Sequence, residues 1–355
     1  MLKNFLREYN LNRIFLSNIG LWPFQKKCVR TLLYTFCFLL ELSYCPFEVL
    51  LLYDHWDDTQ TIFEGGYQIV MLVSFFVRLL NEFWNRKKVI QLYQVIDNHW
   101  NIFTNDIEVR VLKNYSMLSR KFTKYYSLLM YSMMSGFIVI PLKPVFLDII
   151  LPLNDTRPRF LAFEVEFRIN TDKYFLLCFV YTTAITIVGI SIMVSVDAMR
   201  IACTAHACSL FMAVSQRIES IIMEVDSNEE PGSYKYRKLT STEFELKEKI
   251  MYQEYIDCVK KHQLAIEFVN MMESSYQGLS LFLLLLSIAT ISCIGVRILY
   301  VLDQLGEAIR FAFIIVGALL TVLIPCYSGQ RLIDESQNVI RMGMSYFTAF
   351  VSLKD

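Results

Sequence analysis

Long apolar stretches separated by short polar segments dominate the pattern of this 355-residue chain. Each stretch approaches the roughly 20 apolar residues that a helix needs to cross a bilayer, and no repeated ten-residue alternation typical of a transmembrane barrel occurs. Helical spans are therefore expected at Leu32–Tyr53, Tyr67–Trp84, Tyr125–Ile150, Tyr174–Met199, Leu279–Leu302 and Phe311–Tyr327. The pattern predicts an all-α, polytopic membrane helical bundle with six full spans.

A shorter apolar stretch follows at Val339–Leu353. About 15 residues of helix measure only about 22 Å, whereas the hydrocarbon core is about 30 Å thick. Because the segment before it is polar, the chain is expected to reverse direction at Gln337 and Asn338, although neither glycine nor proline is present to make the turn. The sequence therefore predicts a truncated seventh span.

Positive charge is distributed unevenly between the two sides of these spans. The connection 54–66 contains four acidic residues and no Lys or Arg, whereas Lys and Arg gather before the first span and after the second, at Lys3, Arg7, Arg13, Lys26, Lys27, Arg30, Arg86, Lys87, Lys88, Arg110, Lys113, Arg120, Lys121 and Lys124. Since Lys and Arg accumulate in cytoplasmic loops, the N-terminus is expected to be cytoplasmic.

The same pattern predicts the organisation of the chain. Residues 1–31 form a cytoplasmic N-terminal segment, and residues 32–327 form the six-span bundle. Within the bundle, residues 200–277 are expected to be a cytoplasmic helical extension with apolar positions at helical spacing. Residues 328–355 are a truncated anchor and the remnant of the seventh helix.

Composition and charge restrict the possible partners. Hydrophobic residues make up 55% of the chain, above the roughly 45–50% of soluble proteins, and the mean hydropathy is +0.39. Charged residues make up 19% and cancel to a net charge of zero. The chain therefore has no basic field that could attract nucleic acid, and the expected partner of its surface is a membrane.

Motifs that carry enzyme chemistry are absent from the sequence. No nucleophile elbow, phosphate-binding glycine loop or zinc-protease motif occurs, so we expect no enzyme and no cofactor. The tightest metal-like group, Cys203, His206 and Cys208, lacks the roughly four ligands that zinc needs, so no metal site is predicted. Asn154 begins an Asn-Asp-Thr sequon in a connection that the charge pattern places outside, and it is a predicted glycosylation site.

Ionisable residues inside the spans allow two interpretations. Glu41 and Glu48 are seven residues apart and share one face of the first span. Intramembrane carboxylates can carry protons, which leaves a proton-coupled transporter open; alternatively, both are neutral or face protein. Arg78 and Arg297 lie toward span ends, where we expect them to snorkel or to pair locally.

The segment 324–336 reads Ile-Pro-Cys-Tyr-Ser-Gly-Gln-Arg-Leu-Ile-Asp-Glu-Ser. It closely resembles the stretch that ends the sixth helix of insect odorant receptors, where a Cys, an aromatic residue, a Gly, an amide and a Glu/Asp-Ser pair follow one another. Weaker matches lie at 197–219, at 262–266 and at 153–158. That family also has a cytoplasmic N-terminus, as the charge pattern predicts here, whereas G-protein-coupled receptors have theirs outside.

One departure from the family concerns the last helix. Family members carry a further cytoplasmic helix and an aromatic patch after the Glu-Ser pair, but here Gln337 leads almost directly into Arg341–Phe347. The latter segment looks like the outer half of the family's pore-lining seventh helix. The resemblance therefore implies an internal deletion and a pore remnant at Tyr346, Phe347 and Phe350.

By this resemblance, the chain is an odorant receptor subunit of the plasma membrane. Such subunits bind a small volatile ligand among helices two to six and open a cation pore together with the family's co-receptor, as a hetero-oligomer that is expected to be a tetramer. The ligand should be mostly apolar, because the spans offer Phe, Met, Tyr and hydroxyl groups rather than buried charge. The alternatives are an insect gustatory receptor and an ion-coupled secondary transporter.

Candidate pocket residues follow from helical spacing in the second span. Tyr67, Met71 and Ser74 repeat at i, i+4 and i+7 and share one face. The facing partners are expected on the third, fourth and fifth spans, at Phe137, Pro141, Phe175, Phe179, Thr182 and Tyr300.

Overall fold

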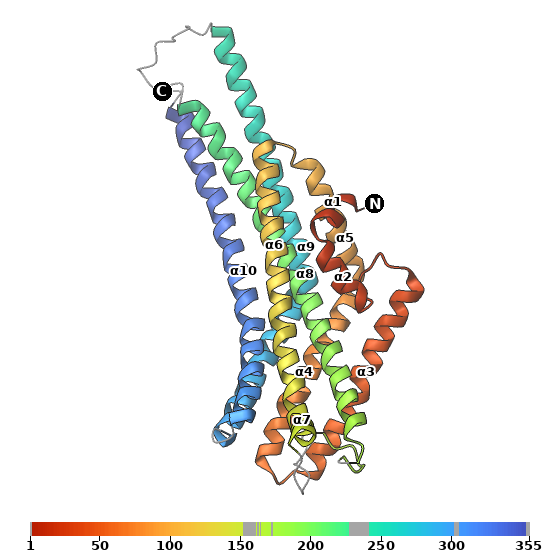
Figure 1. Ribbon diagram of the computed structural model, residues 1–355. Helices are drawn as coiled ribbons and strands as arrows, with labels where there is room; N and C mark the ends of the chain where they lie inside the picture. The colour runs from red at the N-terminus through yellow and green to blue at the C-terminus, as the bar shows by residue number, and fades with distance from the viewer. Residues whose placement is uncertain are drawn as a thin grey trace.

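Long helices run along one common axis in the computed structural model, which describes residues 2–151, 161, 163, 165–171, 173–226, 241–301 and 305–352 (Figure 1). The helices are α1 (Lys3–Glu8), α2 (Asn10–Asn18), α3 (Lys27–Asp54), α4 (Thr59–Trp84), α5 (Arg86–Ile102), α6 (Asp106–Val139), η1 (Ile140–Leu142), α7 (Lys143–Ile150), α8 (Phe175–Asp226), α9 (Ser241–Val301) and α10 (Leu305–Ser352).

Six of the described helical segments are long and apolar enough to cross a membrane. They are Lys27–Asp54, Thr59–Trp84, Asp106–Ile150, Phe175–Met223, Lys249–Val301 and Ala308–Ser345. Each contains one of the predicted spans or nearly all of it. The six spans and the all-helical class are thereby confirmed, and the protein is a multi-pass membrane protein.

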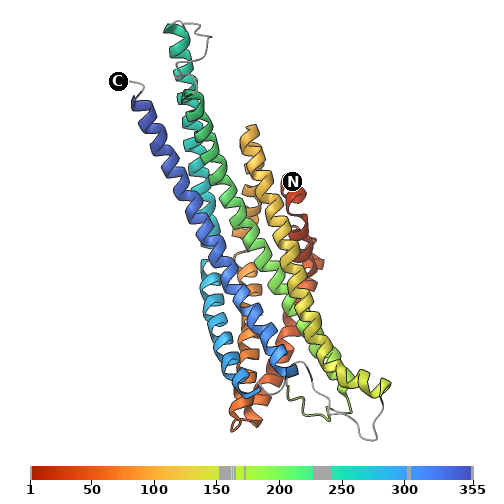
Figure 2. The same ribbon diagram turned by 60° about the vertical axis from the view of Figure 1, so that its left-hand side comes forward.

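Helix α8 is the centre of the bundle. It is 52 residues long, which corresponds to about 78 Å at the rise of an α-helix. Helices α6, α9 and α10 pack on α8, and α4 packs on α9. At one end of the bundle, called the extended end here, α8, α9 and α10 reach further than the other helices (Figures 1 and 2). The predicted extension 200–277 thus begins and ends inside helices that are continuous with the spans.

The N-terminal helices pack against the bundle in the half that lies toward the extended end (Figure 1). Phe5 of α1 is fully buried, and its ring lies 5.2 Å from Tyr9, 5.7 Å from Trp22 and 5.0 Å from Tyr93 of α5. The backbone N–H of Phe5 donates to Asp97 Oδ1 at 2.8 Å. The first residues of the chain therefore belong to the packed core.

The opposite end, called the loop end, carries the turn between α3 and α4 as well as α7. The connection expected at 54–66 is shorter than predicted, because α4 begins at Thr59. Asp58 caps this helix by accepting from the Gln60 N–H at 3.0 Å. Glu64 is fully buried in the first turns and pairs with Arg297 at 3.1 Å and Arg310 at 2.6 Å. Because the charge of Glu64 is paired, α4 can continue through a polar sequence. Arg297 was expected to snorkel or to pair locally, but it pairs with a residue of another helix.

The reversal expected at Gln337 and Asn338 is wrong. Helix α10 continues without a break from Leu305 to Ser352, so residues 339–352 prolong the sixth span toward the extended end. Without glycine or proline, nothing favours a turn here, and Tyr115 of α6 donates to Glu335 at 2.7 Å and holds this part of α10 against α6. A separate seventh span is therefore not confirmed.

Two groups of predicted residues cannot be placed in detail. Tyr346, Phe347 and Phe350 lie on the continuation of α10, but their side chains are outside the described part of the structure. Asn154 also lies outside the described residues.

Candidate ligand-binding cavity

A mostly apolar cavity of about 110 Å³ lies between α4, α6, α8, α9 and α10. Its lining residues are Met71, Ser74, Phe75, Arg78, Met130, Met133, Met134, Phe137, Phe163, Thr186, Ile190, Met193, Leu283, Leu286, Ser287, Thr290, Phe313, Ile314, Gly317, Ala318 and Thr321. On every helix they recur at spacings of three or four, so each helix contributes one face. Five methionines are among them, and such flexible thioethers adapt to ligands of different shape.

Three of the residues expected from the sequence meet in this cavity. Met71 and Ser74 lie on one face of α4, and Phe137 lies on α6 with its ring 4.9 Å from Phe163. The Ser74 hydroxyl donates to the Met71 carbonyl at 2.7 Å, so its oxygen remains able to accept a hydrogen bond.

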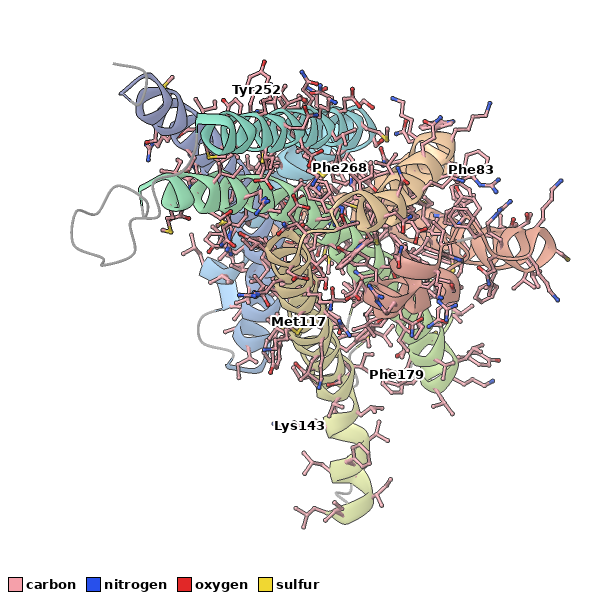
Figure 3. The ribbon with its side chains drawn as sticks, turned by 90° about the horizontal axis from the view of Figure 1, so that it is seen from above. Phe83, Met117, Lys143, Phe179, Tyr252 and Phe268 are labelled. Atoms are coloured by element: carbon pink, nitrogen blue, oxygen red, sulfur yellow. The ribbon has the colours of Figure 1, made fainter. Side chains whose placement is uncertain are left out.

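Three expected residues on or near α8 lie apart from the cavity. Phe175 and Phe179 stack with their rings 6.0 Å apart, in a cluster with Leu161 and Cys178. In the view along the bundle, Phe179 lies on the opposite side from Tyr252 of α9 (Figure 3). The Thr182 hydroxyl bonds to carbonyl groups of its own helix, at 3.1 Å from Cys178 and 3.2 Å from Phe179.

The remaining three expected residues also lie outside the cavity wall. Tyr67 is fully buried, and its ring lies 5.9 Å from Phe311 of α10. Pro141 is buried in the short helix η1, next to the start of α7. Tyr300 near the end of α9 is 53% exposed and therefore faces away from the bundle.

Arg78 is the cavity residue that sequence reasoning assigned to another role. It is 1% exposed and pairs with Asp197 of α8, with Nη2 at 2.8 Å from Oδ2 and Nε at 3.3 Å from Oδ1. Its Nη1 donates to the Ser74 carbonyl at 3.1 Å. Arg78 was expected to snorkel or to pair locally, but it is buried and its ionic partner lies 119 residues away in the chain. The expectation of spans without buried charge is also wrong. The signal in the sequence that could have revealed this role was the presence of an ionisable residue within an apolar span.

The pair between Arg78 and Asp197 gives the cavity one strongly polar end. Asp197 also lies 3.7 Å from Arg200, whose Nη1 donates to Ser280 of α9 at 3.2 Å. A guanidinium has more N–H groups than the three hydrogen bonds of Arg78 use, so it can donate to a ligand oxygen as well. An otherwise apolar cavity with one such donor favours a ligand that carries a hydrogen-bond acceptor.

Gly189 of α8 fixes the position of Phe75 in the cavity wall. A Cβ added at residue 189 would come within 2.8 Å of the Phe75 Cδ2 and Cζ atoms, so the ring packs directly on the α8 backbone. Any larger side chain at this position would push the Phe75 ring, and thereby change the shape of the space that Phe75 borders.

A family model covers most of the chain. The model described as "7tm Odorant receptor" matches residues 58–341. This match includes α4 to α9 and most of α10, and so every helix that lines the cavity. Comparison with curated proteins gives no match.

Solved structures show the same fold. The chain is similar to the insect olfactory receptor OR5 from Machilis hrabei, with a TM-score of 0.65 and 15% identity over 94% of this chain and 82% of that one. The structure of that receptor in complex with eugenol gives a TM-score of 0.64 and 14% identity over 99% of this chain and 98% of that one.

Proposed function

The chain belongs to the 7tm odorant receptor family, and from this premise we propose that it binds a small, volatile, mostly apolar ligand in the cavity between α4, α6, α8, α9 and α10. The cavity is the observation that carries the proposal. Apolar side chains from five helices surround it, and Met71, Ser74 and Phe137 are its predicted contact residues. Binding then depends on shape and on burial of apolar surface.

The polar end of the cavity restricts the ligand further. Arg78 is held by Asp197 and has N–H groups left over, while Ser287 and Thr290 place hydroxyls on the α9 wall. A volatile with an oxygen acceptor, such as a phenol, an ester or a ketone, accepts a hydrogen bond from Arg78 while its body fills the apolar part.

Signal transduction requires a pore, and we propose that the subunit opens a cation pore in a hetero-oligomer with the family's co-receptor in the plasma membrane. Apolar side chains beyond the predicted spans support an assembly. Ile333 and Ile340 of α10 are each 52% exposed, and Tyr252 of α9 is 56% exposed. Lipid does not cover these positions if the extended end projects from the membrane, whereas a neighbouring subunit does.

The proposed orientation places the extended end and the N-terminus in the cytoplasm, and Asn154 outside as an N-glycosylation site. Asp57, in the turn between α3 and α4, then faces outward. An epitope tag at Asp57 should be stained in intact cells, whereas a tag at the N-terminus should require permeabilisation. Reversed staining would contradict the orientation and the proposed site at Asn154 together.

Ligand binding is tested with a cavity-filling substitution in α10. Gly317 lines the cavity, and a Cβ added there meets only Met130 Cε, at 3.8 Å, so Gly317→Val adds volume on the cavity side. Gly278 of α9 has open space and does not line the cavity, so Gly278→Val is the matched control. We expect Gly317→Val to weaken binding of eugenol to the purified receptor in nanodiscs by about tenfold, from lost volume and overpacking.

Thermal unfolding with increasing eugenol gives the affinity, because a ligand that binds only the folded state raises the midpoint with concentration. Equal affinities of Gly317→Val and Gly278→Val would place the ligand elsewhere. For gating, odorant-evoked current with the co-receptor supports the proposal, whereas ion-coupled uptake without it supports a transporter.

A further inference from the structure

A second, smaller cavity of about 40 Å³ lies beside the main one, between α3, α4 and α8. Its lining residues are Glu41, Tyr44, Gln68, Met71, Leu72, Phe75, Phe163, Ile185, Thr186 and Ile190. The two cavities share the side chains of Met71, Phe75, Phe163, Thr186 and Ile190. A change of rotamer at the unbranched Met71 would therefore connect them.

Glu41 brings a carboxyl group to the wall of this small cavity. Its side chain is fully buried, and neither carboxyl oxygen has a hydrogen-bond partner among the described residues. The Tyr44 hydroxyl donates to Gln68 Oε1 at 2.9 Å, which orients the amide and leaves Gln68 Nε2 without a partner in the same part of the structure. The cavity thus presents two unused acceptor atoms and one unused donor.

A buried carboxylate is strongly unfavourable unless a proton or a cation neutralises it. No ion pair within the described part of the chain involves Glu41, in contrast to Glu64 and Asp197, which are each paired with arginine. Glu48 lies two turns further along the same face of α3 and does not line the cavity. Glu41 is therefore the carboxyl group that a ligand in this cavity reaches.

We propose that the small cavity binds the amino group of a volatile primary amine, whose apolar body lies toward the main cavity. The inference rests on the proposed odorant-binding function. An ammonium group neutralises the Glu41 carboxylate and donates to it directly, and such charge-assisted hydrogen bonds are about twice as strong as neutral ones. The small volume admits an amino group but leaves little room for a larger head.

The test compares hexylamine with 1-hexanol, which have the same apolar body and differ in the head group. Affinities for the full chain in nanodiscs come from the dependence of the unfolding midpoint on ligand concentration, with empty nanodiscs as the control for partition into lipid. We expect hexylamine to bind about tenfold more tightly than 1-hexanol, because only the amine forms a charge-assisted bond.

Two substitutions remove the carboxylate. Glu41→Gln and Glu41→Leu should both abolish the preference for the amine, whereas Glu48→Gln should keep it. Because the Glu41 carboxyl has no hydrogen-bond partner among the described residues, Glu41→Leu is expected to fold at least as stably as the wild type, which keeps the test usable if Glu41→Gln does not fold.

A preference for hexylamine that persists in Glu41→Gln or Glu41→Leu overturns the inference, and so does equal binding of both ligands to the wild type. In either case, binding of 1-hexanol that is weakened by Gly317→Val leaves the proposed odorant-binding function standing. If neither hexanol nor eugenol binds the wild type, the proposed function and the inference fall together.

Discussion

The two halves of the bundle differ in how their interiors are filled. Toward the extended end, Phe5, Trp22 and Tyr93 interlock with ring distances of 5.0–5.7 Å, and this core unites α1, α5 and the connection before α3. Toward the loop end, the interior contains two cavities, and Glu41 is buried without a partner among the described residues. Dense packing stabilises the fold, whereas the hollow half gives up contacts to make room for a ligand.

The boundary between the halves is the pair of Arg78 and Asp197, and breaking it should have the largest effect. Asp197→Leu leaves the Arg78 guanidinium buried without its carboxylate, which is expected to lower the free energy of unfolding by about 3–5 kcal/mol. Denaturant unfolding of the purified protein measures the loss. The double substitution Arg78→Met with Asp197→Leu should recover most of it; a double variant as unstable as the single one would show that the charge pair is not the cause.

Low pH should destabilise the densely packed half toward the extended end. Burial lowers the pKa of His99 in α5 to about 4, from an ordinary value of about 6.5. Because the unfolded chain takes up this proton first, the contribution of His99 is complete above about pH 6.5 and is lost as the pH falls toward 4, by about 3 kcal/mol at most. Unfolding curves of the wild type and of His99→Gln between pH 7 and 4 measure the difference. Parallel pH dependence of both proteins would contradict the prediction.

Two phenylalanines toward the loop end allow a test of which residues form the cavity wall and which only pack around it. Both are buried, but Phe137 lines the cavity and Phe179 does not. Phe137→Ala should change the affinity ranking of a panel of volatiles by about tenfold, or about 1.4 kcal/mol, whereas Phe179→Ala should leave the ranking unchanged at a similar cost in stability. A shift of the ranking by Phe179→Ala instead would favour the pocket first expected from the sequence.

Hydropathy predicted the six spans because lipid requires long apolar helices, whatever their neighbours. It placed the start of α4 too late, because Glu64 is tolerated only through arginines 233 and 246 residues away in the chain. Helical spacing selected Met71 and Ser74 on one face of α4. It could not reveal that Phe163 approaches Phe137, or that Arg78 meets Asp197, because those contacts depend on how separate helices pack.

The continuity of α8 gives the cavity a mechanical connection to the distant end of the molecule. Ile190 in the cavity wall and Ile221 in the buried core lie on the same unbroken helix, about 46 Å apart at the rise of an α-helix. A rod of this length acts as a lever, so a tilt of about 2° around Ile190 displaces Ile221 by about 1.6 Å. A ligand that differs by a methyl group can thereby move the extended end, while α8 itself keeps its shape.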